Sequence, residues 1–352
     1  MRVVVAMSGG VDSSVAAALL AEAGRDVIGM SMQLYDQRGG ESFGSCCSID
    51  DLHDARRVAA ALGFPHYILN FERQFRDSVI SNFVQEYTAG RTPLPCAHCN
   101  SDLKFATLVD RAEGLGAAEV ATGHYARIDV APDGTRRLKR GADSDKDQSY
   151  FLFSLTQAQL ARASFPVGAL SKAEVREHAR RLGLGVADKP DSQEICFVPD
   201  GDYARFVEKQ APDGRRPGRI ADAQDRTLGH HDGIHRFTIG QRKGLGISAT
   251  APMYVLRIEP ASGTVTVGPK TALERSTCSV SGVNWISGVA PPGWTSVATQ
   301  IRHRHPAASG RVRPLERARA EIEFDMPQLA VTPGQAAVFY DGDAVVGGGW
   351  ID

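Results

Sequence analysis

The feature that most constrains the fold lies at the start of the chain, where an apolar run passes through a glycine-rich turn into a helix-forming segment. Residues 2–7 (RVVVAM) are typical of a strand buried in a parallel sheet. The turn Ser8-Gly9-Gly10-Val11-Asp12-Ser13-Ser14 follows, and helix formers continue to Ala23, just before Gly24. This order of strand, tight turn and helix predicts the first unit of a doubly wound α/β sheet.

The same turn predicts an anion-binding site. Its glycines permit close backbone approach, and its amide groups meet the positive end of the following helix. Ser8, Ser13 and Ser14 add hydroxyl donors, and Asp12 is suited to holding Mg²⁺ beside phosphates. No Lys-Ser or Lys-Thr pair follows the glycines, so the turn is not a Walker A loop. The alternative interpretation is a tight strand–helix turn in which glycine serves packing alone.

The first two hundred residues repeat the alternation of strand and helix patterns. Strands are predicted at 27–32, 67–69 and 120–122, and helices at 52–62, at 105–112 with Ser101 as N-cap, and from a capping box of Ser171 and Glu174 to Gly183. This alternation favours an N-terminal doubly wound parallel sheet.

The pattern changes near residue 204 and becomes β-rich. Apart from a short amphipathic stretch at 203–209, the paired strand patterns at 254–258 with 264–267, and at 336–340 with 344–346, predict hairpins. We therefore expect three domains: an α/β domain at 1–203, a small β-rich domain at 204–273, and a C-terminal β-barrel at 274–352.

The composition excludes several classes of protein. With 42% hydrophobic and 23% charged residues, the 352-residue chain is typical of a folded protein rather than of a disordered or fibrous one. No stretch reaches the roughly 18 apolar residues of a membrane span, and polar residues from Ser8 onward interrupt any signal-peptide core. We expect a cytoplasmic protein.

The net charge of −1 argues against polyanion binding by the chain as a whole, but basic residues cluster locally. Such clusters suit contact with a phosphate backbone, and they equally suit a solvated charged face. They lie at 136–140, at 215–219, and at Arg302, Arg304, Arg311, Arg313, Arg317 and Arg319.

The cysteines, at positions 46, 47, 96, 99, 196 and 278, are more typical of reactive, metal-binding or inert thiols than of structural disulfides in a cytoplasmic protein. Residues 96–99 (CAHC) form a CxxC motif, but no second CxxC completes a four-cysteine zinc site. Cys99 stands near the predicted N-cap Ser101, where the helix dipole and Lys104 favour a thiolate. Cys196 lies in a polar, irregular segment, and a buried inert thiol is the alternative for it.

The turn at residue 8 resembles the signature of the PP-loop ATP pyrophosphatases, which cleave ATP between the α and β phosphates and adenylate an oxygen of their substrate. A narrower resemblance, to the tRNA-specific 2-thiouridylases within that superfamily, rests on motifs that run in order along nearly the whole chain. These are 90–93 (GRTP), 99–100 (CN), 104–105 (KF), 122–126 (TGHYA), 146–150 (KDQSY), 192–197 (SQEICF) and 237–244 (FTIGQRKG).

This resemblance implies ATP-dependent 2-thiolation of the wobble uridine of tRNA by a sulfurtransferase. ATP adenylates O2 of the uridine and pyrophosphate leaves. Cys196 carries a persulfide delivered by a sulfur-relay protein or a cysteine desulfurase, and its sulfur replaces the activated oxygen with release of AMP. Cys99 acts as nucleophile and partner thiol, which leaves a Cys99–Cys196 disulfide for a reductant to reset.

Other site residues are carried over from the family motifs. The nucleotide would be framed by Ala6, Met7, Ser8, Gly9, Gly10, Val11, Asp12 and Ser13, by Met32, and by the backbone of Gly123. The tRNA would meet Leu94, Pro95 and Cys96, then His124, and then Lys146, Asp147 and Gln148. Its anticodon stem-loop would lie against Arg302, His303 and Gln335 of the C-terminal domain. For His124, a packed histidine at a strand end is the alternative.

The chain departs from the family pattern beside the CxxC motif. Leu94 stands where the family often has Asn, and Cys96 stands where it often has an Asp with a general-base role, so the identity of the base is open. Three thiols, Cys96, Cys99 and Cys196, would then lie near one another, which raises the hypothesis of a metal or iron–sulfur cluster. Tyr35 replaces the usual Trp, and Cys46, Cys47 and Cys278 are interpreted as structural.

Two other classes of function stay open on the residues alone. Another PP-loop enzyme, a ligase or amidotransferase that activates a small carboxylate, would explain the turn at residue 8 but not the two cysteines. A non-catalytic RNA-binding module with a CxxC metal knuckle would leave that turn without a purpose. The products formed from tRNA, ATP, Mg²⁺ and a sulfur donor would separate these hypotheses.

Overall fold

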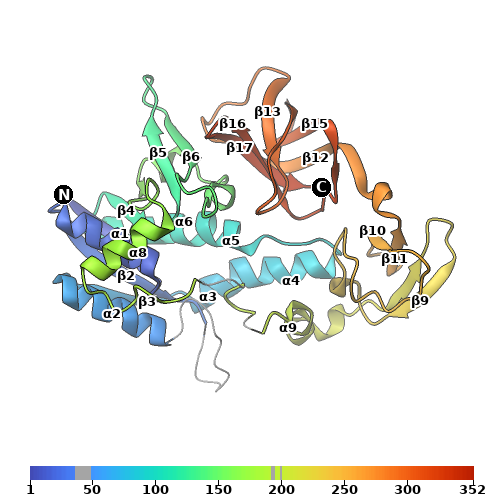
Figure 1. The fold of residues 1–352 in the computed structure, drawn as a ribbon, viewed down its shortest axis with the longest axis horizontal. Coiled ribbons are helices and arrows are strands. Elements are labelled where there is room, and N and C mark those ends of the chain that lie inside the picture. Colours follow the sequence, from blue (N-terminus) through green and yellow to red (C-terminus); the bar gives the residue numbers. More distant parts are fainter. Residues whose placement is uncertain (36–48, 192–194, 199) are drawn as a thin grey trace.

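The computed structural model describes residues 1–35, 49–191, 195–198 and 200–352. They form an α/β part, a small β unit and a C-terminal β-barrel, which lie at the left, lower right and upper right of Figure 1. Cys46, Cys47 and residues 192–194 of the Cys196 motif lie outside the described residues. Within the described ranges, no helix is long and apolar enough to cross a membrane.

A five-stranded parallel sheet forms the centre of the α/β part. Its strands stand in the order β3 (His66–Asn70), β2 (Asp26–Gln33), β1 (Arg2–Ala6), β4 (Glu119–Thr122) and β7 (Ala163–Ser164). The central strand β1 pairs in parallel with both neighbours, so that Val5 stands opposite Gly29 and Ala121. Hydrogen bonding on both edges and burial on both faces explain why this strand is almost wholly apolar.

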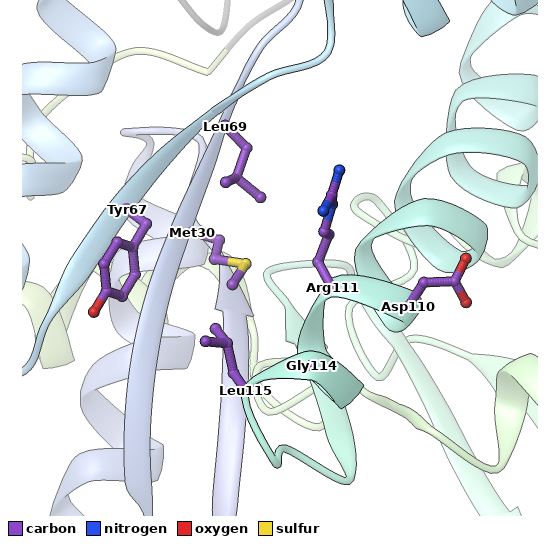
Figure 2. A pocket seen from close by; sticks show the side chains of 7 residues that line it. All are labelled: Met30, Tyr67, Leu69, Asp110, Arg111, Gly114 and Leu115. Carbon is purple, nitrogen blue, oxygen red and sulfur yellow. The ribbon is translucent and has the colours of Figure 1, made fainter.

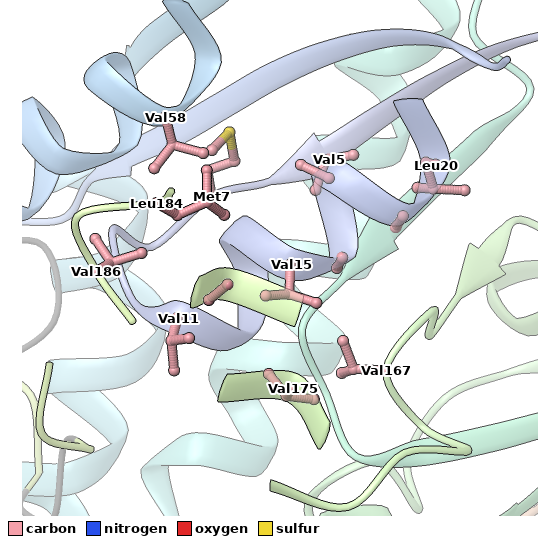
Figure 3. Close-up of a cluster of buried hydrophobic side chains, with 14 of the residues drawn as sticks. Val5, Met7, Val11, Val15, Leu20, Val58, Val167, Val175, Leu184 and Val186 are labelled. Atoms are coloured by element: carbon pink, nitrogen blue, oxygen red, sulfur yellow. The ribbon is translucent and has the colours of Figure 1, made fainter. Parts of the chain in front are cut away.

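Alternate residues of β1 enter two different cores, because successive side chains of a strand point to opposite faces. Val3 and Val5 pack with α1 (Val11–Glu22), α2 (Ile49–Leu62) and α8 (Lys172–Arg181), as Figure 3 shows for part of this core. Val4 packs on the other face against α6 (Phe105–Gly114). The predicted doubly wound sheet is confirmed, as is the capping box of Ser171 and Glu174 at the start of α8.

Two helical runs between β3 and β4 differ from the prediction. The first joins α3 (Glu72–Phe75), the π-helical η1 (Arg76–Ile80) and α4 (Ser81–Thr88), and the second joins α5 (Pro95–His98), the π-helical η2 (Cys99–Lys104) and α6. The predicted N-cap Ser101 is wrong, because it lies inside the second run, where its hydroxyl donates to the Ala97 carbonyl. The N-cap is Leu94, and Pro95 occupies the first helical position, where its missing amide costs nothing.

The small β unit follows α9 (Tyr203–Gln210), the helix that the amphipathic stretch predicted. Its sheet has the order β10 (Tyr254–Glu259), β11 (Thr264–Gly268), β8 (Gly218–Ala221) and β9 (Thr227–His231). The predicted β10–β11 hairpin is confirmed. Short turns of 3₁₀-helix, η4 (Pro212–Gly214) and η5 (Ile234–Arg236), connect the unit, and Ile220, Val255 and Val265 lie in its core.

The C-terminal strands close into a six-stranded barrel after η6 (Lys270–Leu273). In order they are β12 (Glu274–Trp285), β15 (Arg319–Leu329), β14 (Ala308–Leu315), β13 (Thr295–Gln300), β16 (Ala336–Asp341) and β17 (Ala344–Ile351), and β12 pairs with β17 to complete the ring. Closure leaves the barrel without exposed sheet edges. The predicted barrel and the β16–β17 hairpin are confirmed.

An unpredicted hairpin ties the α/β part to the barrel. It consists of β5 (Ala126–Val130) and β6 (Arg136–Arg140), and β6 extends the barrel sheet through the pairing of Lys139 with Ala344. Behind it, the segment with η3 (Ser149–Phe151) and α7 (Gln157–Leu160) shares a core with barrel residues: Phe153 and Leu155 pack in one cluster with Val338. The α/β part and the C-terminal barrel therefore share one apolar core.

Candidate active site

The glycine-rich turn lies at the carboxyl end of β1, the edge at which parallel sheets bind ligands. Gly10 is the N-cap of α1, and no described side chain caps this helix. The Ser13 hydroxyl accepts a hydrogen bond from the Ser8 amide at 3.1 Å and donates to the Gly10 carbonyl at 3.2 Å, so the turn is held closed on itself. The uncapped amides at the positive end of α1 are donors suited to an anion.

Two glycines fit the turn to its neighbours. A Cβ on Gly123, just after β4, would lie 2.5 Å from the Ser13 amide nitrogen and 2.6 Å from the carbonyl carbon of Asp12. Gly9 has φ +75°, and a Cβ there would lie 2.1 Å from the Asp51 carbonyl oxygen at the start of α2. The turn is therefore wedged between β4 and α2, and only glycine allows both approaches.

Asp12, in the first turn of α1, is held by two side chains from distant parts of the chain. The ammonium group of Lys172 lies 2.7 and 2.9 Å from its two oxygens, and the Tyr125 hydroxyl donates to it at 2.8 Å. Burial and the Asp12 charge raise the pKa of Tyr125 far above its ordinary value, so the phenol stays a donor. The Asp12 carboxylate, 32% exposed beside the turn, has the oxygen chemistry that Mg²⁺ prefers.

The segment before Cys196 is anchored to the same turn. Lys189 donates to the Gly9 carbonyl at 3.1 Å and pairs with Asp54 at 2.6 Å, next to the start of α2. Asp191 pairs with Lys172 and with Lys146, both at 2.7 Å. Ion pairs therefore run from the glycine-rich turn to a point five residues before Cys196.

Cys99 and Cys196, far apart in the sequence, belong to one cluster of packed side chains. Cys99 is 8% exposed and lies in η2, whereas Cys196 is half-buried and packs against the cluster from the irregular segment. Met32, near the carboxyl end of β2, belongs to the same cluster. The structure therefore brings both predicted catalytic thiols together with one residue predicted to frame the nucleotide.

The setting of Cys99 differs from the prediction. Because the helical run starts at Pro95, the positive end of its dipole lies at Cys96 rather than at Cys99, and the dipole acts mainly within the first turn. Lys104 donates to the Asn100 side chain at 3.1 Å. Short π-helical insertions occur often at functional sites, and η2 contains Cys99, Asn100 and Lys104 of the family motifs.

The three thiols are not arranged as metal ligands. Among the described residues, which include Cys96, Cys99 and Cys196, no group of three or more His, Cys, Asp or Glu side chains is placed to hold a metal ion. Cys96 is exposed on α5, while Cys99 faces the buried cluster. The geometry that the cluster hypothesis requires is therefore absent from this part of the structure.

The predicted tRNA-contacting residues His124, Asp147 and Gln148 are each held by contacts within the protein. His124 is half-buried against Phe105 and Phe165, and burial and the charge of Lys104 hold the pKa of its imidazole well below the ordinary value. Asp147 organises its own loop: its carboxylate accepts from Arg140 at 2.7 Å and from the backbone amides of residues 141 and 149. The Gln148 side chain accepts from the Tyr125 amide at 3.0 Å.

The barrel residues predicted to meet the anticodon stem-loop lie at its seam with the α/β part. Gln335 donates to the carbonyls of Thr92 and Pro93, both at 3.1 Å, just before Leu94 and Pro95, which are buried. His303 is exposed and lies with its ring 4.7 Å from that of Phe151. The structure therefore places these residues beside the segment that leads to the CxxC motif.

Three of the six arginines at 302–319 form ion pairs in the structure. Arg311 pairs with Glu323 at 2.7 Å, Arg313 with Glu321 at 2.6 Å, and Arg319 with Asp352 at 2.9 Å. Glu321 and Glu323 stand on the neighbouring strand β15, and Asp352 stands at the C-terminus. These acids lie outside the arginine-rich stretch 302–319, so counting charges along that stretch did not reveal the pairs. Within the described ranges, Arg302, Arg304 and Arg317 form no ion pair, and Arg302 donates to the Leu329 carbonyl at 3.4 Å.

A separate groove of about 330 Å³ lies on the α6 face of the sheet. Figure 2 shows Met30 and Leu69 on the strands facing Arg111 and Leu115 at the end of α6. The groove is lined by none of the predicted site residues, and we assign it no part in the chemistry.

Sequence reasoning assigned no role to several residues that build the site. Lys172, Tyr125, Asp191 and Lys189 hold the turn and Asp12 from positions more than a hundred residues away. A signal existed only for the polar run 188–191, which the prediction described as irregular. Which loop such a run contacts is decided by the folded chain.

The fold and the site define an α/β nucleotide-binding protein with a β-barrel appended, and comparison with known proteins agrees. Residues 1–200 match the family model of the tRNA methyl transferase HUP domain, residues 204–269 that of the tRNA methyl transferase PRC-barrel domain, and residues 275–351 that of the aminomethyltransferase beta-barrel domain.

Proteins named tRNA-specific 2-thiouridylase MnmA are similar to the chain along its whole length. Those of Geotalea uraniireducens, Geobacter metallireducens and Solibacter usitatus are 53%, 52% and 52% identical; the matches cover 100%, 100% and 99% of this chain and 95%, 96% and 99% of theirs. The chain therefore belongs to the family of tRNA-specific 2-thiouridylases.

Proposed function

We propose that this protein is a tRNA-uridine 2-sulfurtransferase, which uses ATP to replace O2 of the wobble uridine of tRNA with sulfur. The observation that supports this proposal most directly is the packing of Cys99, Cys196 and Met32 in one cluster at the edge of the sheet that carries the glycine-rich turn. A ligase for a small carboxylate needs the turn but gives no reason for two thiols there.

The turn at residues 8–14 is suited to binding the phosphates of ATP. The amides of the turn and the start of α1 would donate to phosphate oxygens, and Gly123, which has no Cβ, lets the end of β4 pack directly against the turn. Mg²⁺ would be held by Asp12 and would offset phosphate charge during adenylation. Attack by O2 of the uridine on the α phosphate releases pyrophosphate and makes that oxygen part of a good leaving group, AMP.

Sulfur transfer then requires two electrons, and the two thiols can supply them. The outer sulfur of a Cys196 persulfide bonds to C2 of the uridine, and AMP leaves with the original oxygen. The bond between that sulfur and the Cys196 Sγ breaks as the Cys99 thiolate attacks the Sγ. The products are 2-thiouridine and a Cys99–Cys196 disulfide, which an external thiol reductant reduces.

The partners follow from this chemistry. The persulfide comes from a sulfur-relay protein or a cysteine desulfurase, and the tRNA anticodon stem-loop contacts the seam between the α/β part and the barrel, where Gln335 and His303 lie. We expect the protein to act in the cytoplasm. An iron–sulfur cluster is not needed for this reaction, and iron and sulfide analysis of anaerobically purified protein would detect one.

The test supplies unmodified tRNA, ATP, Mg²⁺ and a persulfide donor and follows both halves of the reaction. The wild type should form 2-thiouridine, AMP and pyrophosphate. Asp12→Ala should lose adenylation, whereas Cys196→Ser should still form the tRNA adenylate but no 2-thiouridine, because Cys196 acts after ATP. Formation of ADP, or full thiolation by Cys196→Ser, would refute the proposal.

A further inference from the structure

Arg140, the last residue of β6, joins the loop at 146–148, which we expect to contact tRNA, to the C-terminal barrel. Its guanidinium group donates to the Asp147 carboxylate at 2.7 Å and to the side-chain oxygen of Gln300 at 3.3 Å. The guanidinium carbon also lies 3.6 Å from the centre of the Tyr340 ring, which is a cation–π contact. One side chain therefore holds together a loop of the α/β part and two strands of the barrel, β13 and β16.

The carboxylate that Arg140 holds determines the shape of the loop. The Asp147 side chain is 8% exposed, and it accepts from the backbone amides of residues 141 and 149 at 2.9 and 3.1 Å. The Ser149 hydroxyl donates to the same carboxylate at 3.0 Å and lies 3.2 Å from the Tyr340 hydroxyl. A carboxylate this buried is costly without a cation beside it. Among the described residues, Arg140 is the one cation that pairs with Asp147.

The second partner of Arg140 leads to the barrel residues that we expect to meet the anticodon stem-loop. Gln300 is 6% exposed, and its amide nitrogen donates to the Arg302 carbonyl at 3.2 Å. The guanidinium group of Arg140 therefore lies between two surfaces that we expect to contact tRNA, the loop at 146–148 and the barrel at 302–303.

We propose that Arg140 is a positioning residue for tRNA, which holds the loop at 146–148 in the place from which loop and barrel contact the same anticodon stem-loop. The inference rests on the proposed function, because it takes tRNA as the substrate. Two hydrogen-bonding partners and a buried tyrosine ring already occupy the guanidinium group, so it acts through the loop rather than on the RNA. Without Arg140 the loop would hold this place only part of the time, and the affinity for tRNA would fall by that fraction.

The test measures the Kd for an unmodified tRNA with uridine at the wobble position. It also measures, without tRNA, the Kd for an ATP analogue with a methylene group between the α and β phosphates. Arg140→Met should bind the tRNA about 10- to 100-fold more weakly, as expected if the loop is in place for about 1–10% of the time. Binding of the analogue should stay within about twofold of the wild type, since Asp12 keeps its contacts with Lys172 and Tyr125. Arg140→Lys keeps a charge beside Asp147 and should recover part of the tRNA affinity.

The matched control is Arg25→Met. The Arg25 side chain is 25% exposed and pairs with Glu119 at 2.7 Å, much as that of Arg140 is 28% exposed and pairs at 2.7 Å. Arg25 stands at the amino edge of the parallel sheet, opposite the glycine-rich turn, so both affinities should keep the wild-type value. Unchanged tRNA binding in Arg140→Met, equal weakening of tRNA and analogue binding, or no recovery in Arg140→Lys would overturn the inference. If the wild type itself bound no tRNA, the proposed function would fall and the inference with it.

A second comparison separates positioning from direct contact with the RNA. Asp147→Asn keeps the oxygen that accepts from the backbone amides but removes the charge that Arg140 holds. If Arg140 acts through Asp147, adding Arg140→Met to Asp147→Asn should cost at most about threefold more in tRNA affinity, because the effects of coupled residues do not add. An equal loss with and without Asp147→Asn would assign Arg140 a direct contact with tRNA and overturn its positioning role.

Discussion

Replacing Gly123 by alanine places a methyl group where the structure has the backbone of the glycine-rich turn. The added Cβ would lie 2.5 Å from the Ser13 amide nitrogen and 2.6 Å from the Asp12 carbonyl carbon, while an ordinary contact begins at 3.4 Å. Both atoms are backbone, so no side chain can rotate away. The turn must shift by roughly 1 Å, as overpacking does elsewhere in tightly packed cores.

The magnitude follows from where the strain falls. Overpacking costs about 1–3 kcal/mol, and if ATP binding requires the unshifted turn, the same free energy weakens ATP binding by roughly 5- to 150-fold. A displacement of about 1 Å at a reacting centre can also lower the rate about 100-fold. We therefore expect Gly123→Ala to remain folded, with a lower melting temperature, and to lose most ATP binding and adenylation.

The assay is a titration with an ATP analogue that has a methylene group between the α and β phosphates. Thermal unfolding is then measured with and without this analogue. Gly185→Ala is the matched control, because a Cβ there meets nothing within 4 Å and the residue is exposed. The control should bind the analogue as the wild type does. Affinities of the two variants within twofold of each other would refute the view that the close packing of Gly123 on the turn maintains the phosphate site.

Two further predictions concern acid stability and salt. Burial and the Lys104 charge hold the pKa of His124 well below its ordinary value, so the unfolded chain takes up a proton below about pH 6.5 that the folded chain does not. Its contribution to stability is therefore complete above that pH and is lost as the pH falls toward the folded-state pKa, by up to about 1.4 kcal/mol per pH unit. His124→Gln should flatten this slope in urea titrations between pH 7 and 5 (the range set by the ordinary histidine pKa), and an unchanged slope would contradict a neutral His124. For tRNA binding, Arg304→Ala should lower the slope of log Kd against log salt concentration by about one phosphate contact, while Arg313→Ala should change it less because Glu321 already pairs with Arg313. Equal decreases of the salt slope in the two variants would show that the ion pair with Glu321 does not prevent Arg313 from contacting RNA.

Features that depend only on consecutive residues could be predicted from the sequence, whereas other features could not. The glycine-rich turn and its helix could be predicted because strand, turn and helix are consecutive, and their amide donors depend only on local backbone conformation. The start of the helical run before α6 could not be predicted in this way. It begins at Pro95, and a π-helical insertion follows, so Ser101 lies inside the run and is not its N-cap. The β5–β6 hairpin was also missed, since its basic residues suggested surface charge rather than a strand.

By itself, the sequence determined the class of the protein: a parallel sheet, a phosphate-binding turn at its first strand, two thiols in family motifs, and a β-rich C-terminal half. Only the tertiary structure decided that Lys172 and Tyr125 hold Asp12, that Met32 packs in the cluster of Cys99 and Cys196, and that Arg311, Arg313 and Arg319 are paired with acids. The physical reason is the range of the interactions. Backbone preferences act over a few residues, whereas an ion pair or a packed thiol depends on which distant segment the fold brings within a few ångströms.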